Sequence, residues 1–301
     1  MGCFEVASVT GDTYILPNRG DGLLDMVPTS QPATRVWNPG HYVQINRNAN
    51  FMTSGSKQSN RFAEYQRIIN EFDPADIGTK LIGIGVPICW SGVEGAQGDY
   101  SAGLSEYSGD LSWLAQRGLR MFVRMIDIHY GGSVATTPQF PAYVKSNDWL
   151  YDGKSSQVQW KRWVPSAVNA YAAAVTSLVN ELTSGPNSDY FEGMAFNRET
   201  ATAYPDGGVP GYSDSGWRAG TLELQSQLSG LWTKVVGVQF TNYGPGGFVP
   251  TIVNSLAGNN MGIGGPDCLS TLETWGVSAY IGNTAINGVP ATQDWRGIIP
   301  A

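Results

Sequence analysis

The chain carries few charged residues for its length, and their balance is acidic. Only 14% of its 301 residues are Asp, Glu, Lys or Arg, against about a quarter in an average soluble protein. The formal net charge is −7, and no basic run is longer than Lys161-Arg162. Because such a chain has no electrostatic attraction for a phosphate backbone, we expect no nucleic-acid partner.

Cysteine, histidine and long apolar runs are also scarce. The three cysteines, Cys3, Cys89 and Cys268, are too few and too scattered for a disulfide framework or a Cys-based zinc site. With only His41 and His129, a His-rich zinc site is excluded, and we expect neither a metal nor a cofactor. No run of about 18 residues lacks charges and turn-formers, so no transmembrane helix is expected.

What the chain does contain is an alternation of short β-rich runs with amphipathic helical runs. Helices are predicted with Ser59 as N-cap, with Asp110 as N-cap, and from Pro165 at the first helical position. The alternation favours a parallel α/β architecture, and because neither a G-x-G-x-x-G nor a P-loop sequence is present, we favour a (β/α)8 TIM-type barrel over a doubly wound sheet. The predicted strands are 41–46, 81–87, 119–127, 191–196, 235–241 and 261–264.

The sequence predicts one main domain. Residues 1–38 look irregular, with turn signals, and residues 39–301 form the barrel domain. Six strands are readable by residue 264, which leaves a short stretch in which 277–281 and 297–300 are candidate strands without room for the usual helices. We therefore expect a barrel that is incomplete or reduced at its C-terminal end.

Polar and aromatic residues follow the predicted strands. In β/α barrels the functional residues lie at the carboxyl ends of the strands and on the loops that follow them. Carboxylates and amides can bind sugar hydroxyls, and Trp and Tyr rings stack on the apolar faces of pyranose rings. The residues in these positions are Trp90, Glu94, Asp127, His129, Asn197, Glu199, Tyr243 and Asp267.

The strand endings resemble those of the (β/α)8 glycoside hydrolase clan that includes family 5 cellulases and mannanases. Residues 124–130 are similar to the third-strand ending of these enzymes and residues 191–200 to the fourth. Residues 90–118 are similar to their second strand end and the helix that leads to the third strand, and residues 262–267 to the sixth strand. The resemblance covers about residues 40–270.

The resemblance implies roles for individual residues. Glu199 would be the acid/base, and Asn197 would bind the sugar 2-hydroxyl. His129 and Tyr243 would be substrate-binding residues. The pattern departs from the family at Arg198, which separates an Asn and a Glu that are adjacent there, and a nucleophilic Glu after a seventh strand is not found.

The sequence does not identify which residue supplies the second catalytic carboxyl group. Glycosidases place two carboxyl groups about 5–5.5 Å apart when they retain configuration and about 6.5–9.5 Å apart when they invert it. Asp267 is our candidate, with a helix cap as its structural alternative. Asp127, Glu94 or a residue that the sequence does not identify are the other possibilities.

The remaining candidates have structural alternatives too. Asp127 and His129 are two residues apart and share a face of a continuing strand, which suits a substrate subsite, a metal pair or a structural hydrogen bond to a neighbouring strand end. Trp90 and Tyr243 are sugar platforms or core residues. The alternative for Glu199 is an ion pair with Arg198 or with the arginine at position 124.

The sequence thus predicts a glycosidase that cleaves a β-linked polysaccharide or oligosaccharide. A non-catalytic glycan-binding barrel is the first alternative. A metal-dependent hydrolase that uses Asp127, His129, Glu199 and Asp267 is the second. The acidic, lysine-poor, aromatic-rich composition leads us to expect an extracellular or periplasmic protein, although no signal peptide is visible. The sugar, the linkage, the stereochemistry and the oligomeric state are not readable from the sequence.

Overall fold

The computed structural model places its largest sheet at the centre of the molecule. Residues 9–10, 13–14, 41–45, 58–71, 81–130, 132–153, 157–196, 208–240, 251, 255–256 and 258–264 are described. Within them, the central sheet has six parallel strands in the order β11-β10-β9-β5-β4-β3. These strands are β3 (His41–Gln44), β4 (Leu81–Cys89), β5 (Arg120–Ile126), β9 (Phe191–Phe196), β10 (Val236–Phe240) and β11 (Gly262–Gly264).

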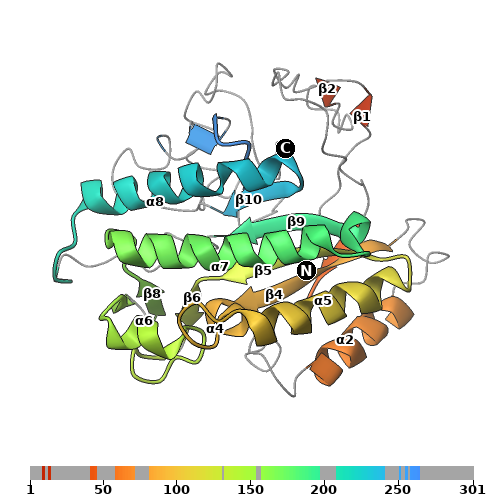
Figure 1. Ribbon diagram of the computed structural model, residues 1–301, viewed down its shortest axis with the longest axis horizontal. Helices are drawn as coiled ribbons and strands as arrows, with labels where there is room; N and C mark the ends of the chain where they lie inside the picture. The colour runs from red at the N-terminus through yellow and green to blue at the C-terminus, as the bar shows by residue number, and fades with distance from the viewer. Residues whose placement is uncertain are drawn as a thin grey trace, which may run out of the picture.

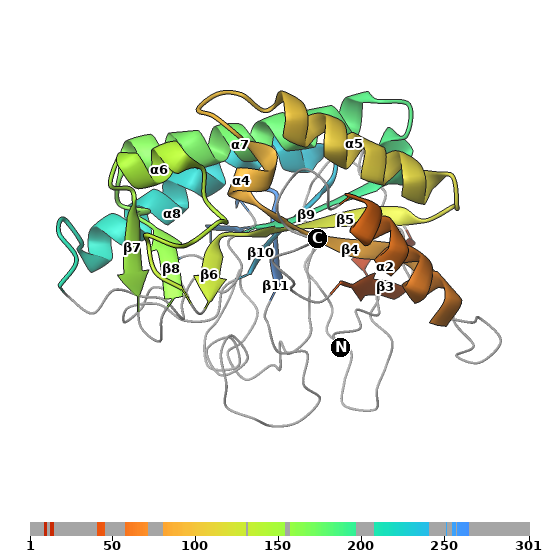
Figure 2. The same cartoon turned by 90° about the horizontal axis from the view of Figure 1, so that it is seen from below.

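Helices connect the parallel strands and gather on one side of the sheet (Figures 1 and 2). The helix α7 packs against both α5 and α8, and α5 also packs against α2. The helices thus follow one another in the same order as the strands that they connect. They are α2 (Gln58–Glu71), α4 (Trp90–Val93), α5 (Ser101–Ala115), α7 (Pro165–Ser184) and α8 (Asp214–Leu228), with the 3₁₀ helices η2 (Ser188–Tyr190) and η3 (Ser229–Thr233).

Within the described residues, the strands of the central sheet lie side by side in their order along the chain, and that order has no point at which it reverses. A doubly wound sheet has such a point, with helices on both faces, whereas a (β/α) barrel has neither. The predicted α/β class and the strand order of a barrel wall are therefore confirmed. Within the described residues, β3 and β11 are the outer strands of the sheet.

The sheet curls toward the face that is opposite the helices, which we call the inner face. The Tyr42 hydroxyl of β3 donates a hydrogen bond of 3.2 Å to Oε2 of Glu192 on β9. Two strands lie between β3 and β9, so their backbones would be about 14 Å apart in a flat sheet. From β5, the guanidinium of Arg124 reaches the backbone oxygen of Ile45, at 2.9 Å. These contacts across the inner face indicate the curvature of a barrel wall.

A small antiparallel sheet interrupts the regular alternation between β5 and α7. Its order is β6-β8-β7, from β6 (Ile128–Tyr130), β7 (Leu150–Gly153) and β8 (Gln157–Trp160). The short helix α6 (Ala142–Ser146) lies between β6 and β7. In Figure 2 the three strands lie together at one end of the molecule.

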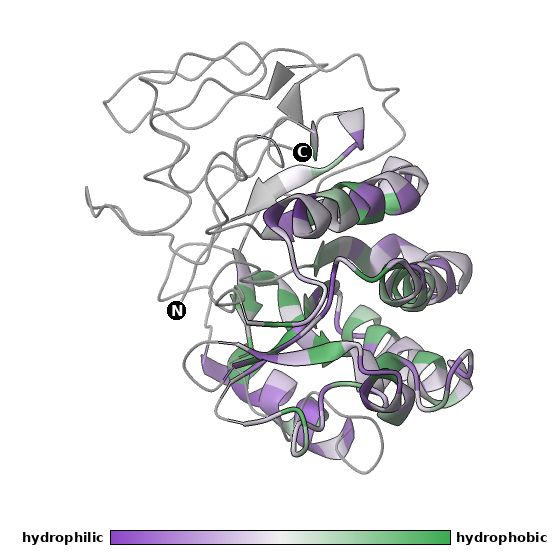
Figure 3. Ribbon diagram, turned by 90° about the vertical axis from the view of Figure 1, so that its left-hand side faces the viewer, coloured by the Kyte–Doolittle hydropathy of each residue, from purple (hydrophilic) through white to green (hydrophobic). Residues whose placement is uncertain are grey.

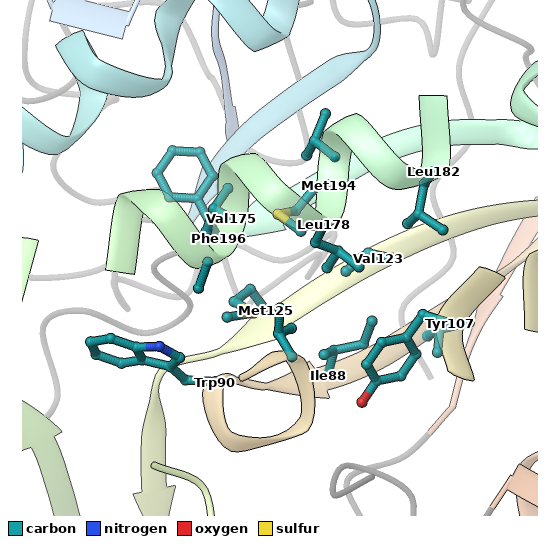
Figure 4. Packing of buried hydrophobic residues seen from close by; sticks show 14 of the residues in the cluster. Ile88, Trp90, Tyr107, Val123, Met125, Val175, Leu178, Leu182, Met194 and Phe196 are labelled. Carbon is teal, nitrogen blue, oxygen red and sulfur yellow. The ribbon is translucent and has the colours of Figure 1, made fainter. Parts of the chain in front are cut away.

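Apolar side chains fill the space between the central sheet and the helices. On α7, the predicted stripe is buried along its whole length, from Val168 through Val175 and Leu178 to Leu182. Figure 4 shows Val175, Leu178 and Leu182 of this stripe above Val123 and other strand residues. The exposed sides of the same helices are mainly polar (Figure 3). None of the described helices is both long enough and apolar enough to cross a membrane.

Most predicted elements are found, with three differences. The helix that was predicted to start after Asp110 begins at Ser101, so Asp110 lies inside α5 and is buried rather than capping it. The helix α2 begins at Gln58, so Ser59 is not its cap. The strands β6, β7 and β8 and the helix α8 were not predicted.

Only a few residues near the two ends of the chain are described, so they say little about the predicted domain boundaries. In the segment 1–38, β1 (Val9–Thr10) and β2 (Thr13–Tyr14) pair in antiparallel fashion. The candidate strands 277–281 and 297–300 lie outside the described residues. The division at residue 38 and the reduced C-terminal end stay predictions.

Candidate functional site

The carboxyl ends of β4, β5, β9 and β10 lie at one edge of the central sheet, because these strands are parallel. This edge carries four of the predicted site residues, Trp90, Glu94, Asp127 and His129. The structure therefore reports on the part of the predicted site that follows β4 and β5. The other four, Asn197, Glu199, Tyr243 and Asp267, lie outside the described residues.

The direction of each side chain after β5 follows from the strand alternation. Met121, Val123 and Met125 pack into the main core beneath the helices. Ile126 and Ile128 instead form a separate cluster with Cys89 of β4. Because alternate residues of a strand point to opposite faces, the even-numbered residues face inward and the odd-numbered ones face the helices. The odd-numbered Asp127 and His129 therefore fall on the helix-facing side.

Asp127 forms a buried ion pair on that side. Both Asp127 and Arg162 have 0% exposure, and Nη2 of Arg162 donates to Oδ2 of the carboxylate. The indole Nε1 of Trp160 donates to the same oxygen at 3.4 Å. Burial raises the pKa of the Asp127 carboxyl, and the positive charge of Arg162 opposes that rise.

Aromatic rings enclose the guanidinium of Arg162. Its Cζ atom lies 4.9 Å from the ring centre of Trp160 and 5.6 Å from that of Trp217. Trp160 in turn stacks on Tyr171 of α7, with ring centres 4.9 Å apart. These contacts keep Asp127 in a closed structural pair. Because its charge is paired with Arg162 and it lies on the helix-facing side, away from the inner face, this geometry corrects its prediction as a substrate contact and removes it as the second catalytic carboxyl.

Trp90 is a core residue. Its side chain has 0% exposure, and the rings of Phe140, Tyr143, Trp160 and Tyr171 meet it edge to face, with centres 5.2 to 6.5 Å away. Figure 4 labels Trp90 among the buried residues of the main core. Since protein side chains surround the ring, a sugar cannot stack on it in this conformation. The structural alternative for Trp90 is the one that the geometry supports.

Glu94, another possibility for the second carboxyl, is also buried, with 1% exposure. Its Oε2 accepts hydrogen bonds from the Trp90 indole at 2.7 Å and the Tyr143 hydroxyl at 2.8 Å. Its Oε1 accepts one from the backbone N–H of Gly98 at 2.7 Å. Three donors thus hold Glu94 in place, and it is not available as the second catalytic carboxyl.

His129 is the predicted site residue whose side chain is partly exposed in the described part of the chain. Its Nδ1 is buried and has no hydrogen-bond partner there. The imidazole packs against Gly132, where an added Cβ would lie 2.3 Å from Nε2 of the ring. Partial burial lowers the pKa of His129, and the charge of Lys145 lowers it further. The neutral ring is therefore favoured, and it is able to donate or accept a hydrogen bond.

Two glutamines of β8 have the features of site residues, and the sequence prediction missed them. Gln157 and Gln159 alternate with Val158 and Trp160, which belong to the main core. Gln159 pairs with Ile128 in the strand register, so it shares the face of that inward-pointing residue. The signal in the sequence is the alternation of polar and apolar residues in Gln-Val-Gln-Trp.

The described residues do not assemble a metal site. No group of three or more His, Cys, Asp and Glu side chains comes together among them. Asp127 and His129 share a face as predicted, but Asp127 is occupied by Arg162. The proposal of a metal-dependent hydrolase thus has no support from the two predicted ligands that the structure describes.

Comparisons with known proteins give matches among solved structures only. No family model matches the chain, and no curated protein does. Endo-glycoceramidase II from Rhodococcus sp. matches at 16% identity with a TM-score of 0.44, over 80% of this chain and 57% of that protein. The exo-beta-1,4-mannosidase from Opitutaceae bacterium strain TAV5 matches at 14% identity with a TM-score of 0.42, over 70% of this chain and 34% of that protein.

A third match is the family 1 b-glucosidase from Thermotoga maritima. It has 13% identity and a TM-score of 0.38, over 61% of this chain and 37% of that protein. The names of all three proteins are those of glycosidases. The chain spans between about a third and somewhat more than half of their lengths.

Proposed function

We propose that the protein is a glycosidase that acts on a β-linked oligosaccharide or polysaccharide, with Glu199 as its acid/base. The observation that carries this proposal is the place of β9 in the sheet, between β5 and β10. Asn197 follows the last residue of β9 directly, and only Arg198 separates it from Glu199. Residues that follow a central strand of a barrel wall are at the edge where barrel enzymes hold their substrates.

The proposed chemistry assigns a role to each group. Glu199 protonates the leaving glycosidic oxygen while the sugar develops positive charge, and Asn197 donates a hydrogen bond to the 2-hydroxyl. A second carboxylate attacks the sugar or activates a water. Because Asp127 and Glu94 are held in buried contacts, Asp267 is our candidate for that role, and Tyr243 is our candidate for stacking against the sugar. The substrate is a carbohydrate, and we propose an extracellular or periplasmic location.

The test compares hydrolysis of β-glucans, β-mannans and aryl β-glycosides by the wild type and by Glu199→Gln. Loss of a general acid or base lowers the rate by about 10²- to 10⁴-fold. Glu223→Gln on α8 is the matched control, since the side chain of Glu223 lies on the exposed surface. We expect kcat to collapse in Glu199→Gln and to stay unchanged in Glu223→Gln, with equal Tm values for the two variants.

Asp267→Asn, assayed on the same panel, tests the second carboxyl. Hydrolysis that survives Glu199→Gln at full rate contradicts the assignment of the acid/base. If the wild type binds an oligosaccharide saturably without cleaving any member of the panel, the non-catalytic glycan-binding barrel replaces the enzyme as the function.

A further inference from the structure

The small β6-β8-β7 sheet extends the inner face of the barrel wall. Its first strand continues directly from β5, and Ile128 joins Ile126 and Cys89 in one buried cluster. Gln159 lies opposite Ile128 in the register, and Tyr151 lies opposite Gln159 on the other side. These side chains therefore share one face, and that face adjoins the carboxyl edge of β4 and β5.

Buried polar atoms on this face have no partner in the described part of the chain. Oε1 of Gln159 accepts a hydrogen bond from the Tyr151 hydroxyl at 2.9 Å, which turns the amide so that Nε2 is left to donate. That Nε2 is buried and unpartnered, and so is Oε1 of Gln157. The exposed fractions of the two residues are 0% and 8%. Other buried polar atoms of the described residues also lack a partner, but these two lie on one strand face beside the carboxyl edge of the sheet, where a ligand would satisfy both.

We propose that Gln157 and Gln159 form a sugar-binding subsite in which one ring hydroxyl accepts from Nε2 of Gln159 and another donates to Oε1 of Gln157. Alternate residues of a strand are about 7 Å apart, a spacing that one sugar ring with its hydroxyls can bridge. Neither amide is charged, which suits a neutral hydroxylated ligand. This inference rests on the proposed function and refines its substrate class. It assigns sugar recognition to the segment 128–160, which holds β6, α6, β7 and β8 and which we call the excursion.

The burial of the two glutamine amides suits residues that determine which sugar binds. A hydroxyl that is missing or inverted leaves a buried amide unpaired, so such a site discriminates more strongly than an apolar pocket of the same size. Held by Tyr151, Gln159 supplies a fixed donor. Gln157, with 8% exposure, supplies an acceptor, Oε1, on the same face.

The experiment measures oligosaccharide binding in a Glu199→Gln background, so that hydrolysis does not consume the probe. The probe is an oligosaccharide of the best substrate in the panel, or cellohexaose and mannohexaose if none is cleaved. The variants are Gln157→Leu and the double substitution Tyr151→Phe/Gln159→Leu, which leaves no tyrosine hydroxyl without its acceptor. Gln227→Leu on the exposed side of α8 is the control.

We expect each test variant to raise Kd about tenfold or more, because a buried hydrogen bond is lost. Tm should stay level or rise, since leucine replaces a buried unsatisfied amide with a group of similar size. That combination supports the subsite. The control should change neither quantity. A crystal structure with the soaked probe should show both amides in contact with sugar hydroxyls.

An unchanged Kd in the double variant overturns the subsite, and it leaves the proposed function standing if the wild type cleaves a glycan. Weaker binding by the variants together with no hydrolysis by the wild type supports the subsite and refutes the glycosidase. Absence of binding to any probe overturns the subsite. So does a structure in which ordered water alone meets both amides.

Discussion

At the scale of single residues, the structure shows why a polar residue at a strand end does not by itself mark a ligand contact. Asp127 and His129 have the residue types and the spacing of site residues, but the alternation that starts in β5 turns both toward the helices. Arg162, thirty-odd positions further along the chain, then neutralises the buried carboxylate. A buried charge needs such a partner, because an unpaired one is costly.

The pH response of His129 is a prediction at this scale. Its pKa is lowered in the folded protein, so as pH falls below the ordinary value the unfolded chain takes up the proton first. The stability that the neutral ring supports is therefore present at neutral pH and is lost as pH falls from about 6.5 toward the folded pKa. An NMR titration, with the signal assigned from its absence in His129→Gln, should give a pKa below 6.5.

Urea unfolding at several pH values supplies the second measurement. The wild type should lose stability relative to His129→Gln between pH 7 and pH 5, because the variant has no imidazole to protonate at this position. A titration at or above the ordinary histidine pKa, or parallel stability curves for the two proteins, would contradict the placement of the ring against Gly132.

At the scale of elements, Gly220 allows α8 to pack closely against the backbone at Arg162, which lies just before α7. A Cβ at Gly220 would lie 1.7 Å from the backbone oxygen of Arg162, whereas one at Gly230 in η3 would meet nothing within 4 Å. In an unhindered helix, alanine is favoured over glycine by about 1 kcal/mol. Contact between backbone and side chain reverses that preference at position 220.

We predict that Gly220→Ala destabilises the protein by about 1–3 kcal/mol, since the helix must shift to relieve the overlap. Gly230→Ala is the matched control and should leave stability within about 0.5 kcal/mol of the wild type. Chemical denaturation of both variants measures the difference. Equal stabilities would show that α8 does not lie against Arg162 as described.

The sequence predicts elements well where one periodicity decides the structure. Helix α7 is an example, because Val175, Leu178 and Leu182 repeat at helical spacing and are all buried. Asp110 misled the prediction because an Asp before a leucine-rich run has the pattern of an N-cap. In the structure it is buried and paired with Arg61 of α2 at 2.6 Å, a contact between segments that no local pattern encodes.

The candidate site was less predictable than the fold for a related reason. The motifs pointed to the carboxyl edge of the sheet, but the direction of the Asp127 side chain and the burial of Trp90 depend on partners from distant segments, Arg162 and Tyr171. The excursion after β5 was not predicted, although the alternation of Gln157 and its neighbours was visible. Short strands give weak signals, because a few residues fit several structures.

At the scale of the whole molecule, stability depends on the packing of α7 between its neighbours. This helix contacts α5 on one side and α8 on the other, and its buried residues belong to the same core as strands β4, β5 and β9. A cavity beneath α7 therefore weakens several β/α units together. Leu178, with 0% exposure, lies in the middle of that core (Figure 4).

We predict that Leu178→Ala lowers the free energy of unfolding by about 3–5 kcal/mol, through lost burial and the cavity that remains. Asn180→Ala, on the exposed side of the same helix, is the control and should change it by less than about 0.5 kcal/mol. Circular dichroism and tryptophan fluorescence should report one shared transition in Leu178→Ala. Two separate transitions would show that the β/α units unfold independently.

The ion pair between Asp127 and Arg162 also joins the two ends of the excursion, since Asp127 precedes β6 and Arg162 follows β8. The polypeptide leaves the barrel wall at one partner and rejoins it at the other. Because its two ends are joined by this ion pair, substitutions at exposed positions of the excursion need not disturb β5 before it or α7 after it. Since Val158 and Trp160 of this segment belong to the main core, its exposed positions are the ones at which new recognition properties can be introduced while the scaffold keeps its shape.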